Sequence, residues 1–192
     1  MRDRRAVREP IRLERPLESF VEELALCVAT HGDKGPALLW PEDFNTLPEL
    51  LRISRPAYPR AGWRRAGGLP AGATVEHPER PGVPTPEAEL LSSALGERLG
   101  LRVRPSYWFL RSMSVGGRQP SGAVERILTV LEGACRCKLT RETGAHDARP
   151  HDTVDLRLRA GGTLFVPRDH AYELLDVHTP TVLLELALGE AA

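Results

Sequence analysis

Residues 160–189 read AGGTLFVPRDHAYELLDVHTPTVLLELALG and contain the strongest strand signals in the chain. The two glycines predict a tight turn, and the β-branched and aromatic run at residues 163–166 is typical of a short strand. Pro167 cannot donate a ladder hydrogen bond, so it marks the end of that strand. A second strand and a Thr-Pro turn follow. Residues 181–188 are then almost wholly apolar, which indicates a closing strand buried on both faces.

One carboxylate, Glu185, interrupts this apolar closing strand. Side chains alternate along a strand, so Glu185 is expected to face the same way as Leu183 and Ala187. A buried carboxylate is costly unless it is paired, hydrogen-bonded or protonated. Two interpretations therefore stay open. Glu185 either pairs with a buried arginine such as Arg111 or Arg126, or it is unpaired and acts as a general acid or base.

Length and composition limit the function classes. The 192 residues are enough for one domain with a core, and 26 acidic residues balance 26 basic ones. Three cysteines without CxxC spacing argue against a zinc site and a disulfide framework, and fit a reducing cytoplasm. No apolar run reaches membrane-spanning length and no signal-peptide pattern is visible. We therefore expect a cytoplasmic protein with neither nucleic acid nor membrane as partner.

The chain divides into a helical region with a long loop at residues 1–100 and a strand-rich region at residues 101–192. The helices predicted from apolar spacing and caps are residues 16–30, 46–53 and 85–99. The predicted strands are residues 37–40, at least one within 101–115, then 123–131, 134–140, 154–158 and those of the closing stretch. Residues 55–84 are rich in proline, glycine and arginine and are predicted to be mostly loop, with edge strands near residues 63 and 74–76. The fold class is α+β, mainly β, with N-terminal helices packed on a C-terminal antiparallel sandwich or barrel.

The C-terminal half resembles the JmjC-type cupins, the double-stranded β-helix oxygenases that include the bacterial and human ribosomal oxygenases. The resemblance rests on the helix before the barrel, the Glu132-Gly133 turn between two strands, the GGTLFVPR segment at residues 161–168, and the closing strand that ends at Gly189. It implies that the C-terminal region is a double-stranded β-helix, the jelly roll of the cupins.

The resemblance also implies an activity whose residues this chain does not retain. The family hydroxylates its substrates with Fe(II), O₂ and 2-oxoglutarate, and a His-x-Asp pair and a distant His hold the metal. The pair would fall at residues 120–122, which are Pro-Ser-Gly, and the distant His at Tyr172. The basic residue that anchors 2-oxoglutarate would fall at Cys135. The resemblance therefore implies the fold and argues against the reaction, and we expect neither a metal nor a cofactor.

Six residues are candidates for a site that replaces the lost one. The candidate catalytic residues are Glu185, His170 and Tyr172, and the candidate substrate-binding residues are Arg126, Arg111 and Tyr107. Histidine titrates near neutrality and often shuttles protons. His170 lies two residues before Tyr172, so the two share a face if the segment is extended. Structural roles stay open for each residue, as does a different metal site built from His170, Glu125 and Glu185.

Three functions are compatible with these residues. The first is a metal-independent enzyme of specialised metabolism that eliminates, cyclises or isomerises a small anionic substrate by acid-base chemistry. Here Glu185 and His170 would move protons, Tyr172 would assist, and Arg126 would hold the anionic group. The second is a non-catalytic cupin that binds a small molecule or a partner protein. The third is an Fe(II)/2-oxoglutarate oxygenase with atypical ligands. A homodimer would use the N-terminal helices or a sheet edge.

Overall fold

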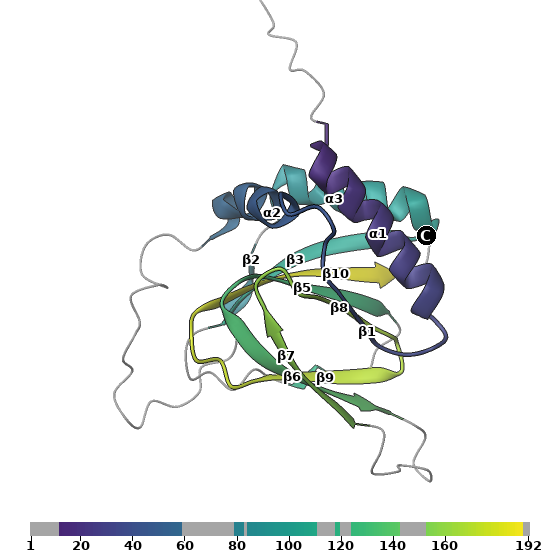
Figure 1. Ribbon diagram of the computed structural model, residues 1–192, viewed down its shortest axis with the longest axis vertical. Coiled ribbons are helices and arrows are strands. Elements are labelled where there is room, and N and C mark those ends of the chain that lie inside the picture. The colour runs from purple at the N-terminus through teal and green to yellow at the C-terminus, as the bar shows by residue number, and fades with distance from the viewer. Residues whose placement is uncertain are drawn as a thin grey trace, which may run out of the picture.

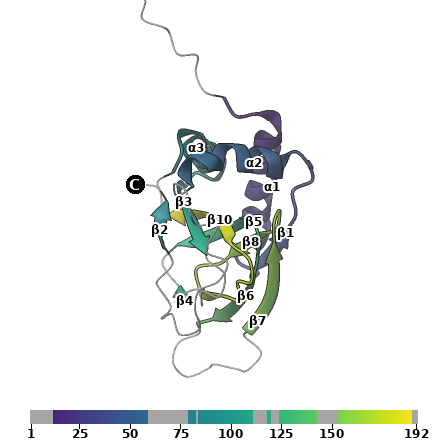
Figure 2. The same ribbon diagram turned by 90° about the vertical axis from the view of Figure 1, so that its left-hand side faces the viewer.

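A computed structural model shows a layer of helices on a sandwich of two sheets (Figure 1). It describes residues 12–58, 79–82, 84–110, 118–119, 124–142 and 153–189. Viewed from the side, the helices form one outer layer, the larger sheet lies in the middle, and the smaller sheet forms the other outer layer (Figure 2). None of the helices among these residues is long and apolar enough to cross a membrane.

The helices form where apolar spacing and caps predict them. They are α1 (Arg15–His31), α2 (Thr46–Ser54) with a short 3-10 turn η1 (Arg55–Ala57), and α3 (Pro86–Leu99). Thr85 caps α3, since its side chain accepts a hydrogen bond from the Ala88 N–H at 3.2 Å. Gly100 ends this helix with a φ of 65°, a conformation that favours glycine.

The described residues include ten strands, which form two antiparallel sheets. They are β1 (Ala37–Leu39), β2 (Glu79–Gly82), β3 (Arg102–Leu110), β4 (Arg118–Gln119), β5 (Glu125–Glu132), β6 (Ala134–Arg141), β7 (Thr153–Arg159), β8 (Thr163–Val166), β9 (His170–Leu175) and β10 (Thr181–Gly189). The first sheet has the order β1-β8-β5-β10-β3-β2, and the second has the order β4-β9-β6-β7.

The strand order is that of a jelly roll. Strands β3, β5, β8 and β10 belong to the first sheet, and β4, β6, β7 and β9 belong to the second. From β3 to β10 the chain therefore crosses between the sheets at every connection except the β6–β7 hairpin. Eight strands wound in this way make a double-stranded β-helix, so the predicted fold class is confirmed.

The N-terminal region contributes strands as well as helices. The predicted strand at residues 37–40 is present as β1, which pairs with β8 at one edge of the first sheet. Strand β2 pairs with β3 at the other edge and lies within the segment predicted to be mostly loop. The edge strands predicted near residues 63 and 74–76 lie outside the described residues.

Two apolar clusters hold the layers together. The outer cluster lies between the helices and the first sheet, and its members include Phe20, Leu24, Leu91, Tyr107 and Phe165. The inner cluster fills the barrel between the two sheets and includes Leu128, Cys137, Leu164, Tyr172 and Leu183. The central strands of the first sheet contribute to both clusters, which explains why β10 is apolar on both faces.

Candidate functional site

Glu185 lies in the interior of the barrel. It is in the middle of β10, with Ser106 of β3 and Leu128 of β5 as its register neighbours, and only 3% of its surface is exposed. Leu183 belongs to the inner cluster and Leu184 belongs to the outer cluster, so β10 alternates as the sequence predicts. Glu185 shares the face of Leu183 and points between the two sheets.

Three side chains from three other strands meet the Glu185 carboxylate. Arg126 on β5 forms an ion pair with Oε1, and the indole N–H of Trp108 on β3 donates a hydrogen bond to Oε2. The Tyr172 hydroxyl on β9 donates to the same Oε2 at 3.4 Å. We call Trp108, Arg126, Tyr172 and Glu185 the interior network. The structure thus agrees with the first interpretation of Glu185, in which an arginine, here Arg126, pairs with it.

The interior network carries one compensated charge inside apolar surroundings. Burial, reinforced by the nearby Glu185 charge, raises the pKa of Tyr172 far above its ordinary value, so the phenol stays protonated. Arg126 is 21% exposed and Trp108 is also of intermediate burial, so these two members bring the network toward solvent. Burial also raises the pKa of the Cys135 and Cys137 thiols to about 12, so both remain neutral parts of the barrel wall.

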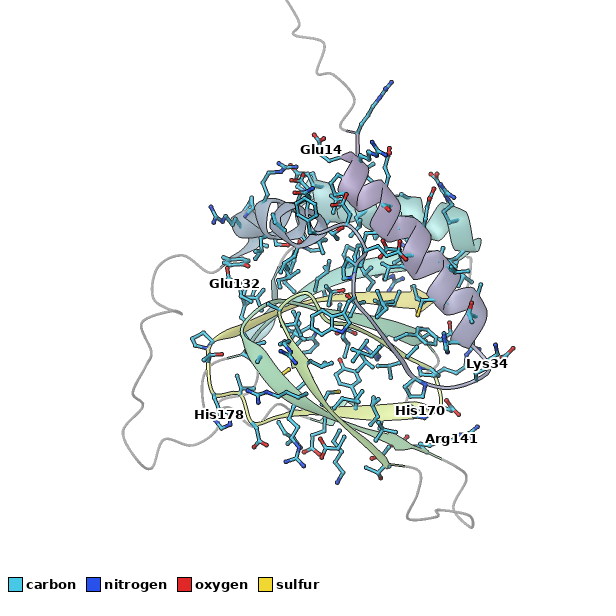
Figure 3. The ribbon with its side chains drawn as sticks, in the orientation of Figure 1. Glu14, Lys34, Glu132, Arg141, His170 and His178 are labelled. Atoms are coloured by element: carbon cyan, nitrogen blue, oxygen red, sulfur yellow. The ribbon has the colours of Figure 1, made fainter. Side chains whose placement is uncertain are left out.

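His170 lies apart from the interior network, at one end of the barrel. It is the first residue of β9, on the same face as Tyr172, because that segment is extended. Its Nδ1 lies 2.7 Å from Asp169 Oδ1, and Arg141 Nε donates to Asp169 Oδ2 at 2.8 Å. Strand pairing explains why Arg141 lies beside Asp169 and His170, since Arg141 is the register partner of His170 across β6 and β9. Figure 3 shows Arg141 and His170 together at this end and His178 at the other.

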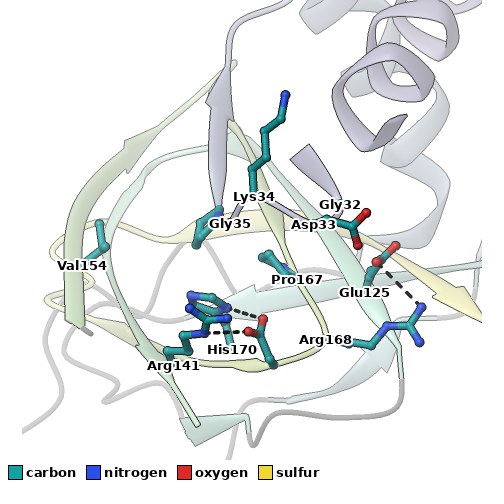
Figure 4. Close-up of a pocket in the computed structure, with 12 residues that line it drawn as sticks. Gly32, Asp33, Lys34, Gly35, Glu125, Arg141, Val154, Pro167, Arg168 and His170 are labelled. Atoms are coloured by element: carbon teal, nitrogen blue, oxygen red, sulfur yellow. Dashed lines mark hydrogen bonds and ion pairs between the residues drawn. The ribbon is translucent and has the colours of Figure 1, made fainter. Parts of the chain in front are cut away.

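These three residues line a pocket of about 680 Å³, which we call the barrel-end pocket. It lies where β6 and β8 end and where β5, β7 and β9 begin, and the turn at residues 32–36 after α1 closes one side (Figure 4). Its charged or titratable lining residues are Asp33, Lys34, Glu125, Arg141, Arg168, Asp169 and His170.

The carboxylate of Asp169 remains ionised in this setting. Burial acts to raise its pKa, but hydrogen bonds and positive charge from His170 and Arg141 outweigh burial, so the pKa lies below its ordinary value. An ionised Asp169 is the preferred partner of the Nδ1–H of the histidine. When the ring is neutral, the tautomer that this pairing favours leaves Nε2 with a free lone pair. The side chain of His170 is only 9% exposed, so the packed wall of the pocket fixes its orientation.

The structure therefore divides the six candidate residues. Glu185, Tyr172 and Arg126 come together in the interior network, while His170 lines the barrel-end pocket; among the described residues no hydrogen bond or ion pair joins His170 to that network. Tyr107 faces the helices, where the Ser54 hydroxyl donates to its oxygen at 3.0 Å. That position does not support a role for Tyr107 in substrate binding. Arg111 lies outside the described residues.

Sequence reasoning did not select Asp169 and Arg141 as site residues. The Asp-His dipeptide at residues 169–170 is a local signal that could have identified Asp169, because it begins a strand directly after a turn. Arg141 had no such signal, since its contact with Asp169 depends on how β6 pairs with β9. Glu125 was considered only as a possible metal ligand, and its contact with Arg168, whose charged group is 3.8 Å away, was not predicted.

The structure describes two of the positions at which the resemblance places parts of an Fe(II)/2-oxoglutarate centre, Tyr172 and Cys135. Tyr172, at the position of the distant His, is a protonated phenol that already donates to Glu185. Cys135, at the position of the basic anchor, is a neutral thiol and cannot bind a carboxylate as a cation would. The positions of the His-x-Asp pair lie outside the described residues. Within the described part of the chain, no three His, Cys, Asp or Glu side chains gather as a metal site would require.

Compared by sequence, the chain matches no family model and no curated protein. Compared by structure, it is similar to RmlC from Streptococcus suis, with a TM-score of 0.40, 14% identity, and 47% of this chain aligned with 45% of that one. It is also similar to oxalate decarboxylase from Lactobacillus farciminis, with a TM-score of 0.39, 9% identity, and coverage of 46% and 25%. YcfD, a ribosomal oxygenase from Escherichia coli, aligns with a TM-score of 0.41, 12% identity, and coverage of 54% and 29%.

The chain spans less than half of the length of each of these three proteins. What defines its fold is the order of its own strands, two four-stranded sheets linked as a jelly roll with extra strands at both edges of the first sheet. By that order, the chain has the cupin fold, a double-stranded β-helix.

Proposed function

We propose that the chain binds a small molecule with an anionic group in the barrel-end pocket and that His170 transfers a proton to or from it. The reaction class is metal-independent acid-base chemistry, namely elimination, cyclisation or isomerisation. The observation that carries the proposal is the Asp169–His170 pair in the wall of a polar pocket. A histidine held in this way resembles the general bases of enzymes, in which a carboxylate orients the imidazole.

Each residue of this group has a defined part in the proposal. Asp169 accepts the Nδ1–H of His170, so Nε2 is the atom that takes a proton from the substrate. Once His170 is protonated, the Asp169 carboxylate stabilises the imidazolium, and the same proton can return to another atom of the substrate. Arg141 uses its Nε to position Asp169, which leaves its two terminal nitrogens for the anionic group of the substrate.

The interior network supports this site and does not take part in the proton transfer. Its carboxylate, Glu185, is engaged by Arg126 and Trp108, so it is not available to a substrate in the pocket. Tyr172 ties β9 to β10 through Glu185, and His170 is the residue two positions earlier on β9. We therefore assign Glu185 and Tyr172 the role of holding the strand that carries His170.

Proton transfer can be tested before the natural substrate is known. The protein is incubated in D₂O with a panel of small 2-oxo and 3-oxo acids, and ¹H NMR follows the loss of the C–H signal beside the carbonyl. We expect the wild type to exchange this proton faster than buffer alone does, and His170→Gln to exchange it no faster than buffer alone. His178→Gln is the matched control, because His178 lies at the far end of β9 (Figure 3). Exchange that is unchanged in His170→Gln would refute the proposal.

Binding without turnover is the second candidate, and the packing of the barrel supports it. Apolar side chains of the inner cluster and the interior network fill the space between the sheets. A ligand at the barrel-end pocket would then be held without being transformed. The same NMR experiment separates the two functions, since a pure binding protein shifts the His170 resonance on addition of ligand but exchanges no proton.

A further inference from the structure

Two acceptors in the barrel-end pocket lack hydrogen-bond partners among the described residues. The Glu125 side chain is only 13% exposed, and its one partner is the Arg168 guanidinium at 3.8 Å, beyond hydrogen-bond distance. The Nε2 atom of His170 has no partner, although the side chain is only 9% exposed. Both groups are of intermediate burial and line the pocket, so a ligand that hydrogen-bonds them would supply the partners they lack.

Both groups can be satisfied by a ligand group that donates hydrogen bonds. An ionised carboxylate can only accept hydrogen bonds, and Nε2 also accepts when Asp169 holds the Nδ1–H. Asp33 adds a second carboxylate on the Glu125 side of the pocket, and the two side chains point into the same region in Figure 4. A hydrogen-bond donor with positive charge, such as a primary ammonium, satisfies this side best.

The other side of the pocket favours a negative group. Arg141 uses only its Nε for Asp169, and its guanidinium lies beside the His170 ring in Figure 4. Arg168 lies on the Glu125 side, is 62% exposed, and contacts Glu125 at 3.8 Å (Figure 4). Guanidinium groups bind carboxylates through paired N–H donors. The Arg141 guanidinium is therefore available to a carboxylate on this side, while the Asp33 and Glu125 carboxylates lie on the other side of the pocket.

We propose that the ligand of the barrel-end pocket is a small zwitterion, a molecule with a primary ammonium and a carboxylate. Its ammonium donates to Glu125 and its carboxylate meets Arg141. This inference rests on the proposed function for the location of the site. It goes beyond the proposed function because a ligand with only an anionic group would bind Arg141 but would make no favourable contact with Glu125.

The test uses a length series of ω-amino acids: glycine, β-alanine and 4-aminobutanoate. The matched single-charge probes are acetate, propanoate, butanoate and butylamine. Binding is measured by titration while ¹H–¹³C NMR follows the His170 ring resonance, which is assigned with His170→Gln. We expect at least one amino acid to bind about tenfold or more tightly than its matched carboxylate, as a charged hydrogen bond would provide.

Two variants give opposite expectations. Glu125→Gln keeps the size of the side chain but removes its charge, so the preference for the amino acid should vanish while carboxylate binding stays unchanged. Arg168→Gln removes the cation that contacts Glu125, so the preference should persist or increase. Glu89→Gln on the exposed face of α3 is the control. Thermal unfolding checks that each variant is folded.

The readout also separates this inference from the proposed reaction. Zwitterion binding without proton exchange would support the ligand class and refute the reaction. Equal affinity for amino acids and their matched carboxylates, with no change in Glu125→Gln, would overturn the inference even if proton exchange were observed. The same holds if butylamine bound as tightly as the amino acids, because the carboxylate would then contribute nothing.

Discussion

Replacing Arg126 by methionine should destabilise the fold strongly, because it removes the counter-ion of a buried carboxylate. Glu185 is 3% exposed, and Arg126 is the only cation that pairs with it among the described residues. Methionine retains much of the length and apolar stem of arginine, so packing changes little. The variant therefore isolates the cost of leaving Glu185 charged inside the barrel, or of protonating it there.

The magnitude follows from the burial of the two partners. Removing one member of a buried ion pair costs about 3–5 kcal/mol in the free energy of unfolding. Arg126 is 21% exposed, and Trp108 and Tyr172 still donate to the carboxylate, so the lower end of about 3 kcal/mol applies here. For a chain of 192 residues this corresponds to a Tm lowered by about 6–12 °C.

A double-mutant cycle measured by urea denaturation checks this reasoning. In Arg126→Met/Glu185→Gln the buried charge is gone, so the double variant should be more stable than Arg126→Met alone. The control is Arg98→Met, which breaks an ion pair with Glu22 whose side chains are 58% and 60% exposed and should cost about 1 kcal/mol or less. A loss in Arg126→Met no larger than that of the control, or strictly additive effects in the cycle, would refute the argument.

Two further changes have defined outcomes. In Asp169→Asn, the free energy of unfolding should fall at pH 7, because an aspartate with a lowered folded pKa contributes stability above its unfolded pKa. The difference in stability from the wild type should shrink as the pH falls below the ordinary pKa of 3.8. Urea titrations that show the same difference in stability at acid pH as at pH 7 would contradict this. Gly133 has a φ of 80°, and a Cβ there would lie 2.5 Å from the Pro180 carbonyl oxygen, whereas Gly100 has a φ of 65° and open space around it. Gly133→Ala should therefore be clearly more destabilising than Gly100→Ala, for which we expect a loss of roughly 1 kcal/mol. Equal losses of stability for the two variants in chemical denaturation would argue against the close contact at Gly133.

The sequence predicts the jelly roll well because its signals are local. The Thr85 cap and Gly100 define the ends of α3, and the apolar run of β10 identifies a strand that is buried on both faces. The Glu132-Gly133 turn between β5 and β6 and the Pro167 stop after β8 are read in the same way. Each of these features depends on the residues at or beside the position, so tertiary contacts are not needed to find them.

The sequence also shows that Glu185 needs a partner, but not which one. Arg111 and Arg126 were equal candidates, because the choice depends on the register between β10 and β5. That register brings Arg126 opposite Ala187, on the same face as Glu185. Register along the chain is fixed by how two sheets close around a core, which is a property of the whole fold.

The barrel-end pocket is likewise decided by the tertiary structure. Its lining comes from the turn after α1 and from the ends of five strands, segments that are distant in sequence. Asp169 beside His170 was visible as a dipeptide, yet Arg141 reaches Asp169 only because β6 pairs with β9. The sequence alone thus determined the three helices, most of the strands and the presence of a buried charge. Sheet order and register decided which charged groups meet, because the strands that carry them become neighbours only once the barrel has closed.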